Sequence, residues 1–168
     1  AMVVAAGQIK MEHTILEDIR SDPAIAAIQD FMEAHMGASL PLHVEARFDN
    51  VDPRAPEALQ ALDDLASWLC AQPIVGHCLG LPDLVRAAWG PLRGEGGLPP
   101  SGAAPRQALV VLGMGSEDPV PGLLWDPGNG TPARARISTR IRDQGHQATL
   151  KLVAEIKEEG ATLLGPLG

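Results

Sequence analysis

The sequence contains few aromatic residues. They make up 3% of the chain and tyrosine is missing altogether, whereas hydrophobic residues make up 45% and charged residues 20%. Aliphatic side chains must therefore supply most of the core packing. A chain of 168 residues can bury a substantial core, so we expect one domain, with or without an appendage.

Long apolar runs are also lacking. No stretch approaches the roughly 20 apolar residues that a helix needs to span a bilayer, and the first residues lack the pattern of a signal peptide. We therefore expect the chain as given to be soluble. Ala1 stands before Met2 like a remnant of recombinant expression, so the natural protein could be longer and could carry membrane segments elsewhere.

Positively charged residues are outnumbered: the chain has 13 Lys and Arg against 21 Asp and Glu, which gives a formal net charge of −8 at pH 7. This argues against non-specific binding of nucleic acid, which requires Lys and Arg to neutralise phosphates. The histidines show no spacing typical of metal ligands, so we expect neither a metal site nor another cofactor. They are His13, His35, His43, His77 and His146.

There are only two cysteines, Cys70 and Cys78. Their spacing is not that of a zinc site or a C-x-x-C motif. They fall at an expected helix end and in the strand that follows, so their side chains could meet. Two interpretations stay open: a pair of small hydrophobic packing residues, or a disulfide in an oxidising compartment.

The segment 56–90 has the clearest periodicity. Its apolar residues recur every three or four positions and predict an amphipathic helix over 56–71: Leu59, Leu62, Ala66 and Leu69. Pro73 prevents the helix from continuing, and the apolar run 74–79 predicts a strand. Pro82 and Asp83 favour the start of another helix.

The segments before and after it are less regular. Residues 1–20 predict a short helix or a docking arm. Asp22 and Pro23 predict a helix to about His35, with Gly37 placed to end it in a left-handed conformation. We expect four residues of that helix to face inward: Ile25, Ile28, Phe31 and Met32. The stretch 91–132 is rich in Pro and Gly and reads as an insertion or lid, with one helix over 106–112. A last helix is predicted over 147–159, with Leu150, Val153 and Ile156 inward and Gly160 as its end, and 162–164 could begin a final strand.

Two strands are strongly indicated by alternation of apolar and polar residues. In 42–48 the apolar residues alternate with His43, Glu45 and Arg47. In 133–142 the apolar residues alternate with a polar set that includes Arg134, Arg136, Arg140 and Arg142. Each strand should have one buried face and one open face.

The order of elements matches an α+β fold. We predict a ferredoxin-like split βαβ sandwich with an antiparallel sheet and two helices on one face. Residues 1–37 would form an N-terminal helical arm, and residues 38–168 the main domain with the insertion 91–132. The helices would cover the apolar side of the strands and leave the arginines on an uncovered face.

The uncovered face and a short cysteine motif are the candidate functional features. Arginines on such a face are either solvated and neutralised by Glu45, or form an interface with another protein domain or an anionic headgroup.

The motif Gly76-His77-Cys78-Leu79-Gly80 resembles the nucleophile elbow of dienelactone hydrolases, for which His146 with Asp126 or Asp143 follow in a suitable order. Only one clear strand precedes it, and an ordinary strand end is the simpler interpretation. The tryptophans are expected in core or lid packing: Trp68, Trp89 and Trp125.

Four stretches in succession resemble a known family. They are FMEAHMGASLPLHVEARFD, PEALQALDDLASWLCAQPIVGHCLGLPDLVRAAW, PRQALVVLGMG and ARARISTRIRD. Together they resemble the second large extracytoplasmic loop of MMPL-like exporters in the resistance-nodulation-division (RND) superfamily. The matching positions are Gly37, Pro41, Leu42, Pro56, Glu57, Pro73, Val75, Gly76, Leu81, Asp83 and Leu84.

The resemblance implies a function that the chain would not perform alone. It implies a porter-like periplasmic domain, without catalytic residues, of a proton-driven exporter of hydrophobic or lipid-like molecules in a bacterial inner membrane. Its partners would be the sister loop and the transmembrane domain of the same polypeptide, with a homo-oligomer as a further option. The proton-carrying residues of such an exporter lie in membrane segments outside this chain. In that periplasmic setting, Cys78 is explained as packing or as the partner of Cys70. The alternatives are a Cys-dependent hydrolase using Cys78 and a soluble protein-interaction domain using the arginine face.

Overall fold

The computed structural model describes residues 22–93, 97–100, 103–114, 120–126, 128 and 132–167. This part of the chain forms a mixed α+β structure with a four-stranded antiparallel sheet and six α-helices. The expected element within residues 1–20 lies outside it. The strands are β1 (Leu40–Phe48), β2 (Val75–Leu79), β3 (Leu124–Trp125) and β4 (Ala133–Ile141). The helices are α1 (Pro23–Met36), α2 (Pro56–Cys70), α3 (Leu81–Arg93), α4 (Ala104–Gly113), α5 (Val120–Leu123) and α6 (His146–Leu164), followed by the 3₁₀ turn η2 (Gly165–Leu167).

Strand β4 is the centre of the sheet. Strand β1 pairs antiparallel with β4 along its whole length, from Leu40 opposite Ile141 to Phe48 opposite Ala133. The other edge of β4 is shared by β2 and the two-residue β3, both antiparallel to it. Because β1 and β2 flank β4 and both oppose it, they run parallel to each other, joined by α2.

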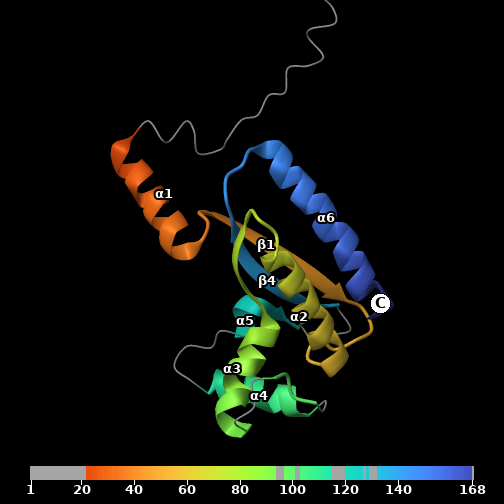
Figure 1. Cartoon of the computed structure of the whole chain (residues 1–168). Helices are drawn as coiled ribbons and strands as arrows, with labels where there is room; N and C mark the ends of the chain where they lie inside the picture. Colours follow the sequence, from red (N-terminus) through yellow and green to blue (C-terminus); the bar gives the residue numbers. More distant parts are fainter. Residues whose placement is uncertain are drawn as a thin grey trace, which may run out of the picture.

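Helices α2 and α6 pack on the same face of this sheet (Figure 1). Their main contact with it is a cluster of buried aliphatic side chains: Leu65, Ala66, Leu69, Val75, Ile137, Ile141, Leu152 and Ile156. Leu42 and Val44 of β1 pack against the cluster from the sheet. The predicted apolar sides of both long strands are thus confirmed, as is the buried stripe of α2.

The insertion shares the core of the sheet and helices. Residues of α4 and β3 are buried together with α2 and α3 in a second cluster: Leu59, Leu81, Val85, Ala88, Ala108, Leu109 and Leu124. The predicted helix over 106–112 is confirmed, and Pro105 lies in its first turn. Two details were not expected. Helix α3 continues through Pro91 to Arg93, and β3 adds a short strand to β4.

Helix α1 has the predicted boundaries but not the predicted burial. Asp22 caps it by accepting a hydrogen bond from the Ala24 N–H at 2.8 Å, and Gly37 ends it with φ of 76°. The prediction that its apolar residues face inward is wrong, because Ile28 and Phe31 are 64% and 57% exposed and Ile25 is 40% exposed. The helix lies beside the sheet, away from α2 and α6 (Figure 1). The apolar stripe of the sequence is therefore not part of the core clusters among the described residues.

The predicted ending of the chain is also corrected. Residues 162–164 are not a strand, because α6 continues to Leu164. Gly160 does not end the helix, since an internal glycine costs only about 1 kcal/mol and packing of Leu164 against two core clusters offsets it. The buried positions of α6 are Leu152 and Ile156, whereas Leu150 is 49% exposed. None of the helices within the described ranges is long and apolar enough to cross a membrane.

Candidate functional site

The face of the sheet opposite α2 and α6 holds the polar residues predicted from the sequence. We call it the open face, formed on β1 and β4 by His43, Glu45, Arg47, Arg134, Arg136, Ser138 and Arg140. Register places Glu45 opposite Arg136 and His43 opposite Ser138. Arg142, just past the end of β4, is turned aside, because its Nε donates to the carbonyl of Gly37 at 3.0 Å.

Glu45 neutralises the arginines at one end of the open face. Its Oε1 accepts from Arg136 Nη2 at 2.7 Å and from Nε at 3.2 Å, and its Oε2 lies 3.8 Å from Arg134 Nη1. The hydrogen bond from Arg136 is the main reason why the pKa of Glu45 is below its ordinary value, with the charges of Arg136 and Arg134 adding to it. This part of the face therefore matches the expectation of a cross-strand neutralised patch.

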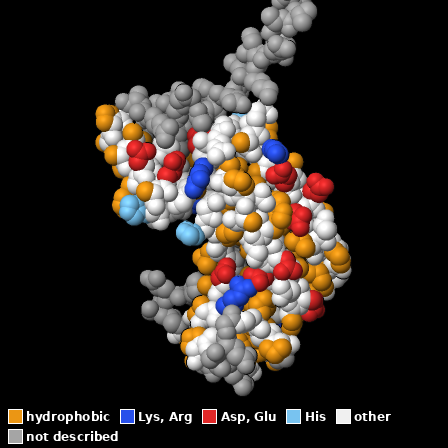
Figure 2. Space-filling model, in the orientation of Figure 1, with side chains coloured by type: hydrophobic (Ala, Val, Ile, Leu, Met, Phe, Trp, Pro, Cys, Tyr) orange, Lys and Arg blue, Asp and Glu red, His pale blue; other side chains and the backbone are white. Residues whose placement is uncertain are grey.

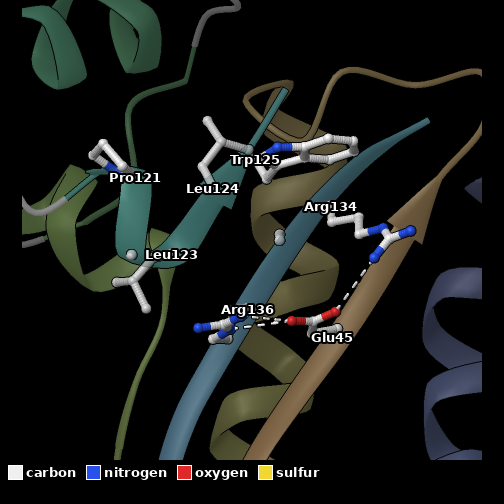
Figure 3. Close-up of a pocket in the computed structure, with 9 residues that line it drawn as sticks. Glu45, Pro121, Leu123, Leu124, Trp125, Arg134 and Arg136 are labelled. Atoms are coloured by element: carbon white, nitrogen blue, oxygen red, sulfur yellow. Dashed lines mark hydrogen bonds and ion pairs between the residues drawn. The ribbon is translucent and has the colours of Figure 1, made fainter. Parts of the chain in front are cut away.

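Trp125 forms the wall of a depression beside this ion pair (Figure 3). The Arg134 guanidinium carbon lies 5.3 Å from the centre of the Trp125 ring, within range of a cation–π contact. The depression has a volume of about 250 Å³ and is closed on its other side by 121–124. Trp125 is 49% exposed and so does not lie in the core; of the two expected roles, core or lid packing, its contact with Arg134 from within the insertion accords with the second.

Arg47 and Arg140 differ in whether a carboxylate neutralises the guanidinium. Arg47 contacts Asp49 at 2.8 Å, a partner on its own chain segment, and both side chains are largely exposed. The side chain of Arg140 is half-buried and makes no hydrogen bond or ion pair with any residue that the structure describes. The one unneutralised guanidinium among the β4 arginines of the open face is therefore that of Arg140.

A second depression surrounds Arg140, and we call it the histidine depression. It has a volume of about 400 Å³ and is lined by His35, Pro41, His43, His77, Leu79, Ser138, Thr139 and Arg140. The three imidazoles come from α1, β1 and β2, and histidine side chains reach the surface on the side where α1 lies (Figure 2). Within the described part of the chain, no three His, Cys, Asp or Glu side chains are placed to hold a metal ion.

Sequence reasoning included His43 in the candidate site but missed His35 and His77. Alternation in β2 would place His77 on the same buried side as Val75, two residues earlier. A shift in register between Val75 and Cys78 leaves His77 exposed instead. No local signal marks His35. It lines the depression because Gly37 and Arg142 fix α1 beside the sheet.

Comparison of the chain with protein-family models, with curated proteins and with solved structures found no match. The candidate site is therefore defined by the geometry of this chain alone.

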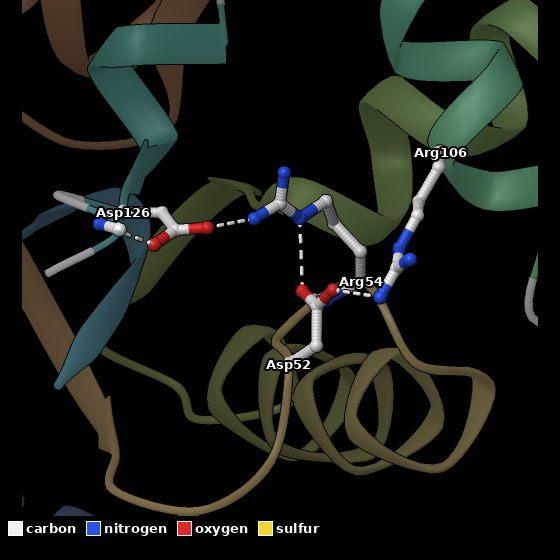
Figure 4. A network of polar contacts seen from close by, with 5 residues as sticks. Asp52, Arg54, Arg106 and Asp126 are labelled. Carbon is white, nitrogen blue, oxygen red and sulfur yellow. Dashed lines mark hydrogen bonds and ion pairs between the residues drawn. The ribbon is translucent and has the colours of Figure 1, made fainter. Parts of the chain in front are cut away.

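A network of ion pairs fastens the insertion to the loop after β1 (Figure 4). Asp52 accepts from Arg54 Nε at 2.8 Å and from Arg106 Nη2 at 2.5 Å, and Arg54 also pairs with Asp126. Burial alone would raise the pKa of Asp52, but these hydrogen bonds outweigh it and the pKa is lowered. The partners are far apart in sequence, and the network is a structural clamp that the sequence did not predict.

Cys78 is bonded to Cys70 and no cysteine is left as a free thiol. The two Cα atoms are 6.0 Å apart, within the usual range for a disulfide. Cys78 lies inside β2, whereas the turn into α3 is at Gly80. Asp126, one proposed partner of His146, contacts Arg54 instead. This arrangement offers no activated thiolate, which a nucleophile elbow requires.

Proposed function

We propose that the chain is a non-catalytic, porter-like extracytoplasmic domain of an RND-superfamily, MMPL-type exporter of hydrophobic or lipid-like molecules. The observation that carries the proposal is the arrangement of β1 and β2 on either side of antiparallel β4, with α2 and α6 on one face. In our proposal this arrangement corresponds to the split βαβ unit of a ferredoxin-like fold. It accords with the family resemblance of the sequence.

The outer edge of β1 adds to the proposal. A ferredoxin-like sheet has its fourth strand at this position, whereas no described residue pairs with this edge. Beside it runs a mainly apolar groove of about 380 Å³ between β1 and α6, lined by Leu42, Val44, Val153 and Ile156 among others. An unpaired strand edge above an apolar groove is suited to receive a strand, and in our proposal the sister loop of the same polypeptide packs there.

The disulfide favours the periplasmic side of the membrane. Structural disulfides persist in oxidising compartments, such as the bacterial periplasm, and are rare in the cytosol. The Cys70–Cys78 bond links α2 to β2 inside the split βαβ unit. A domain folded in the periplasm would form it during folding.

Membrane association and labelling in the full-length gene product test the proposal. Exposed Ala154 on α6 is replaced by Cys in a Cys70→Ala, Cys78→Ala background, with Leu152→Cys, at a buried position of the same helix, as the matched control. We expect the product to sediment with carbonate-washed membranes. A membrane-impermeant maleimide should label Ala154→Cys, and not Leu152→Cys, in intact spheroplasts. A product that stays in the soluble fraction, or is labelled only after lysis, would rule the proposal out.

The two alternatives have less support. A Cys-dependent hydrolase needs a reactive Cys78, and the bond to Cys70 occupies that sulfur. Ester hydrolysis that is lost in Cys78→Ala would restore this alternative. A docking domain that uses the arginine face must overcome the internal pairing of Arg136 with Glu45, which leaves Arg140 as the cation that is free to bind.

A further inference from the structure

Arg140 is unusual among the arginines of the open face because nothing described in the structure neutralises it. Arg134 and Arg136 share Glu45, and Arg47 contacts Asp49. Arg140 is half-buried and lines the histidine depression, and the described residues of that lining include no carboxylate. Withdrawing a guanidinium from water without an anionic partner is unfavourable, so such a group attracts an anion from solution.

We propose that the histidine depression binds an oxyanion, a carboxylate or phosphate group, with the Arg140 guanidinium as its principal donor. Guanidinium binds both groups through two parallel hydrogen bonds, which suits a shallow site on a sheet. The inference does not depend on the exporter proposal, because every residue it uses belongs to the described chain.

The other polar groups of the depression complete the site. The Ser138 hydroxyl lies 3.2 Å from His43 Nδ1, and both come from adjacent positions on β4 and β1. His35 Nδ1 donates to the carbonyl of Phe31 at 2.9 Å, so its Nε2 is the atom left for a ligand. His77 on β2 lines the same depression, so three imidazoles share it with Arg140.

The apolar part of the lining bears on the source of the anion. Pro41 and Leu79 line the same depression, and Leu79 is 48% exposed. A volume of about 400 Å³ exceeds what one phosphate or carboxylate group fills. The anion is therefore either free in solution or the headgroup of a larger molecule whose apolar part contacts these side chains.

Binding to the full chain of 168 residues tests the site with two probes. Sulfate is titrated by calorimetry and by amide chemical shifts, and vesicles of phosphatidylglycerol in phosphatidylcholine are compared with pure phosphatidylcholine. Arg140→Gln should weaken sulfate binding about tenfold or more, because a charge-assisted hydrogen bond is lost. Lys151→Gln is the matched control, since it removes one positive charge from α6 on the covered side. Arg140→Lys should recover part of the affinity.

The remaining outcomes distinguish the two sources of the anion. Sulfate binding that depends on Arg140, without vesicle binding, supports a site for a free anion. Dependence of both sulfate binding and vesicle binding on Arg140 supports a headgroup site. Absence of sulfate binding, or equal losses in Arg140→Gln and Lys151→Gln, would overturn the proposal.

Discussion

Reduction of the Cys70–Cys78 bond should lower the free energy of unfolding by about 2.5 kcal/mol. The bond joins residues separated by 8 positions. Closing a loop of that size removes about 8 cal/mol/K of chain entropy from the unfolded state, which is about 2.5 kcal/mol at 25 °C. Cys70 is exposed and Cys78 only half-buried, so their thiols would lose little packing in the folded state. The effect should therefore come almost entirely from the unfolded chain.

Urea unfolding, followed by circular dichroism with and without reductant, measures this change in the free energy of unfolding. In a thermal unfolding experiment the midpoint should fall by roughly 5–10 °C, because a domain of this size loses about 2–4 °C for each kcal/mol. The double variant Cys70→Ala, Cys78→Ala is the control, and reductant should leave its midpoint unchanged. Mass spectrometry must show that the bond is intact before reduction and absent afterwards. If neither the urea midpoint nor the thermal midpoint changes under those conditions, the entropic explanation is refuted.

Three further variants probe the clamp, the core and the open face. Asp52→Asn removes the carboxylate that Arg54 and Arg106 share and leaves Arg54 with Asp126 alone, so it should cost about 1–3 kcal/mol in urea unfolding at pH 7. Because the pKa of Asp52 is lowered from 3.8 on folding, its stabilising effect is present above that value and is lost as pH falls through the lower folded pKa. The difference from wild type should thus shrink in acid, and a constant difference would contradict the role of its charge. Ile137→Ala should lower the free energy of unfolding by about 2–5 kcal/mol, because the side chain is 1% exposed. Its control, Val110→Ala at a 64% exposed position, should change that free energy by no more than about 0.5 kcal/mol. Equal effects of the two substitutions would contradict the assigned core. Glu45→Gln should leave the thermal midpoint nearly unchanged and raise the affinity for sulfate, since it removes the carboxylate of the open face, and weaker binding would count against the charge argument.

Local sequence patterns predicted the elements that carry the fold. The spacing of Leu59, Leu62 and Leu69 identified α2 and its buried stripe, because the helical period by itself brings these side chains to one face. The Asp22 cap and the glycine at Gly37 fixed the ends of α1 for the same local reason. Alternation in β1 and β4 predicted which side chains share a face, since neighbouring residues of a strand point to opposite sides.

Local sequence patterns did not predict the contacts between residues that are distant in the sequence. An apolar stripe on α1 did not reveal that Ile28 and Phe31 would remain exposed, because amphipathicity does not identify a partner surface. The contact between Arg54 and Asp126 spans 72 positions, and nothing local distinguishes those residues from other surface charges. The strand expected over 162–164 became the end of α6, where packing against the clusters of the sheet overrode a glycine.

The sequence by itself determined that arginines would occupy one face of a strand and that two cysteines would lie near a helix end and the next strand. Only the tertiary structure decided that Glu45 neutralises Arg136 while no described residue pairs with Arg140 beside the histidines, and that the two sulfurs are bonded. The physical reason is that the period of a strand fixes the direction of each side chain, whereas its neighbours depend on register between strands distant in sequence. The sequence therefore predicted which residues share the open face. Which of them lie next to one another was decided by the pairing of β1 and β2 with β4.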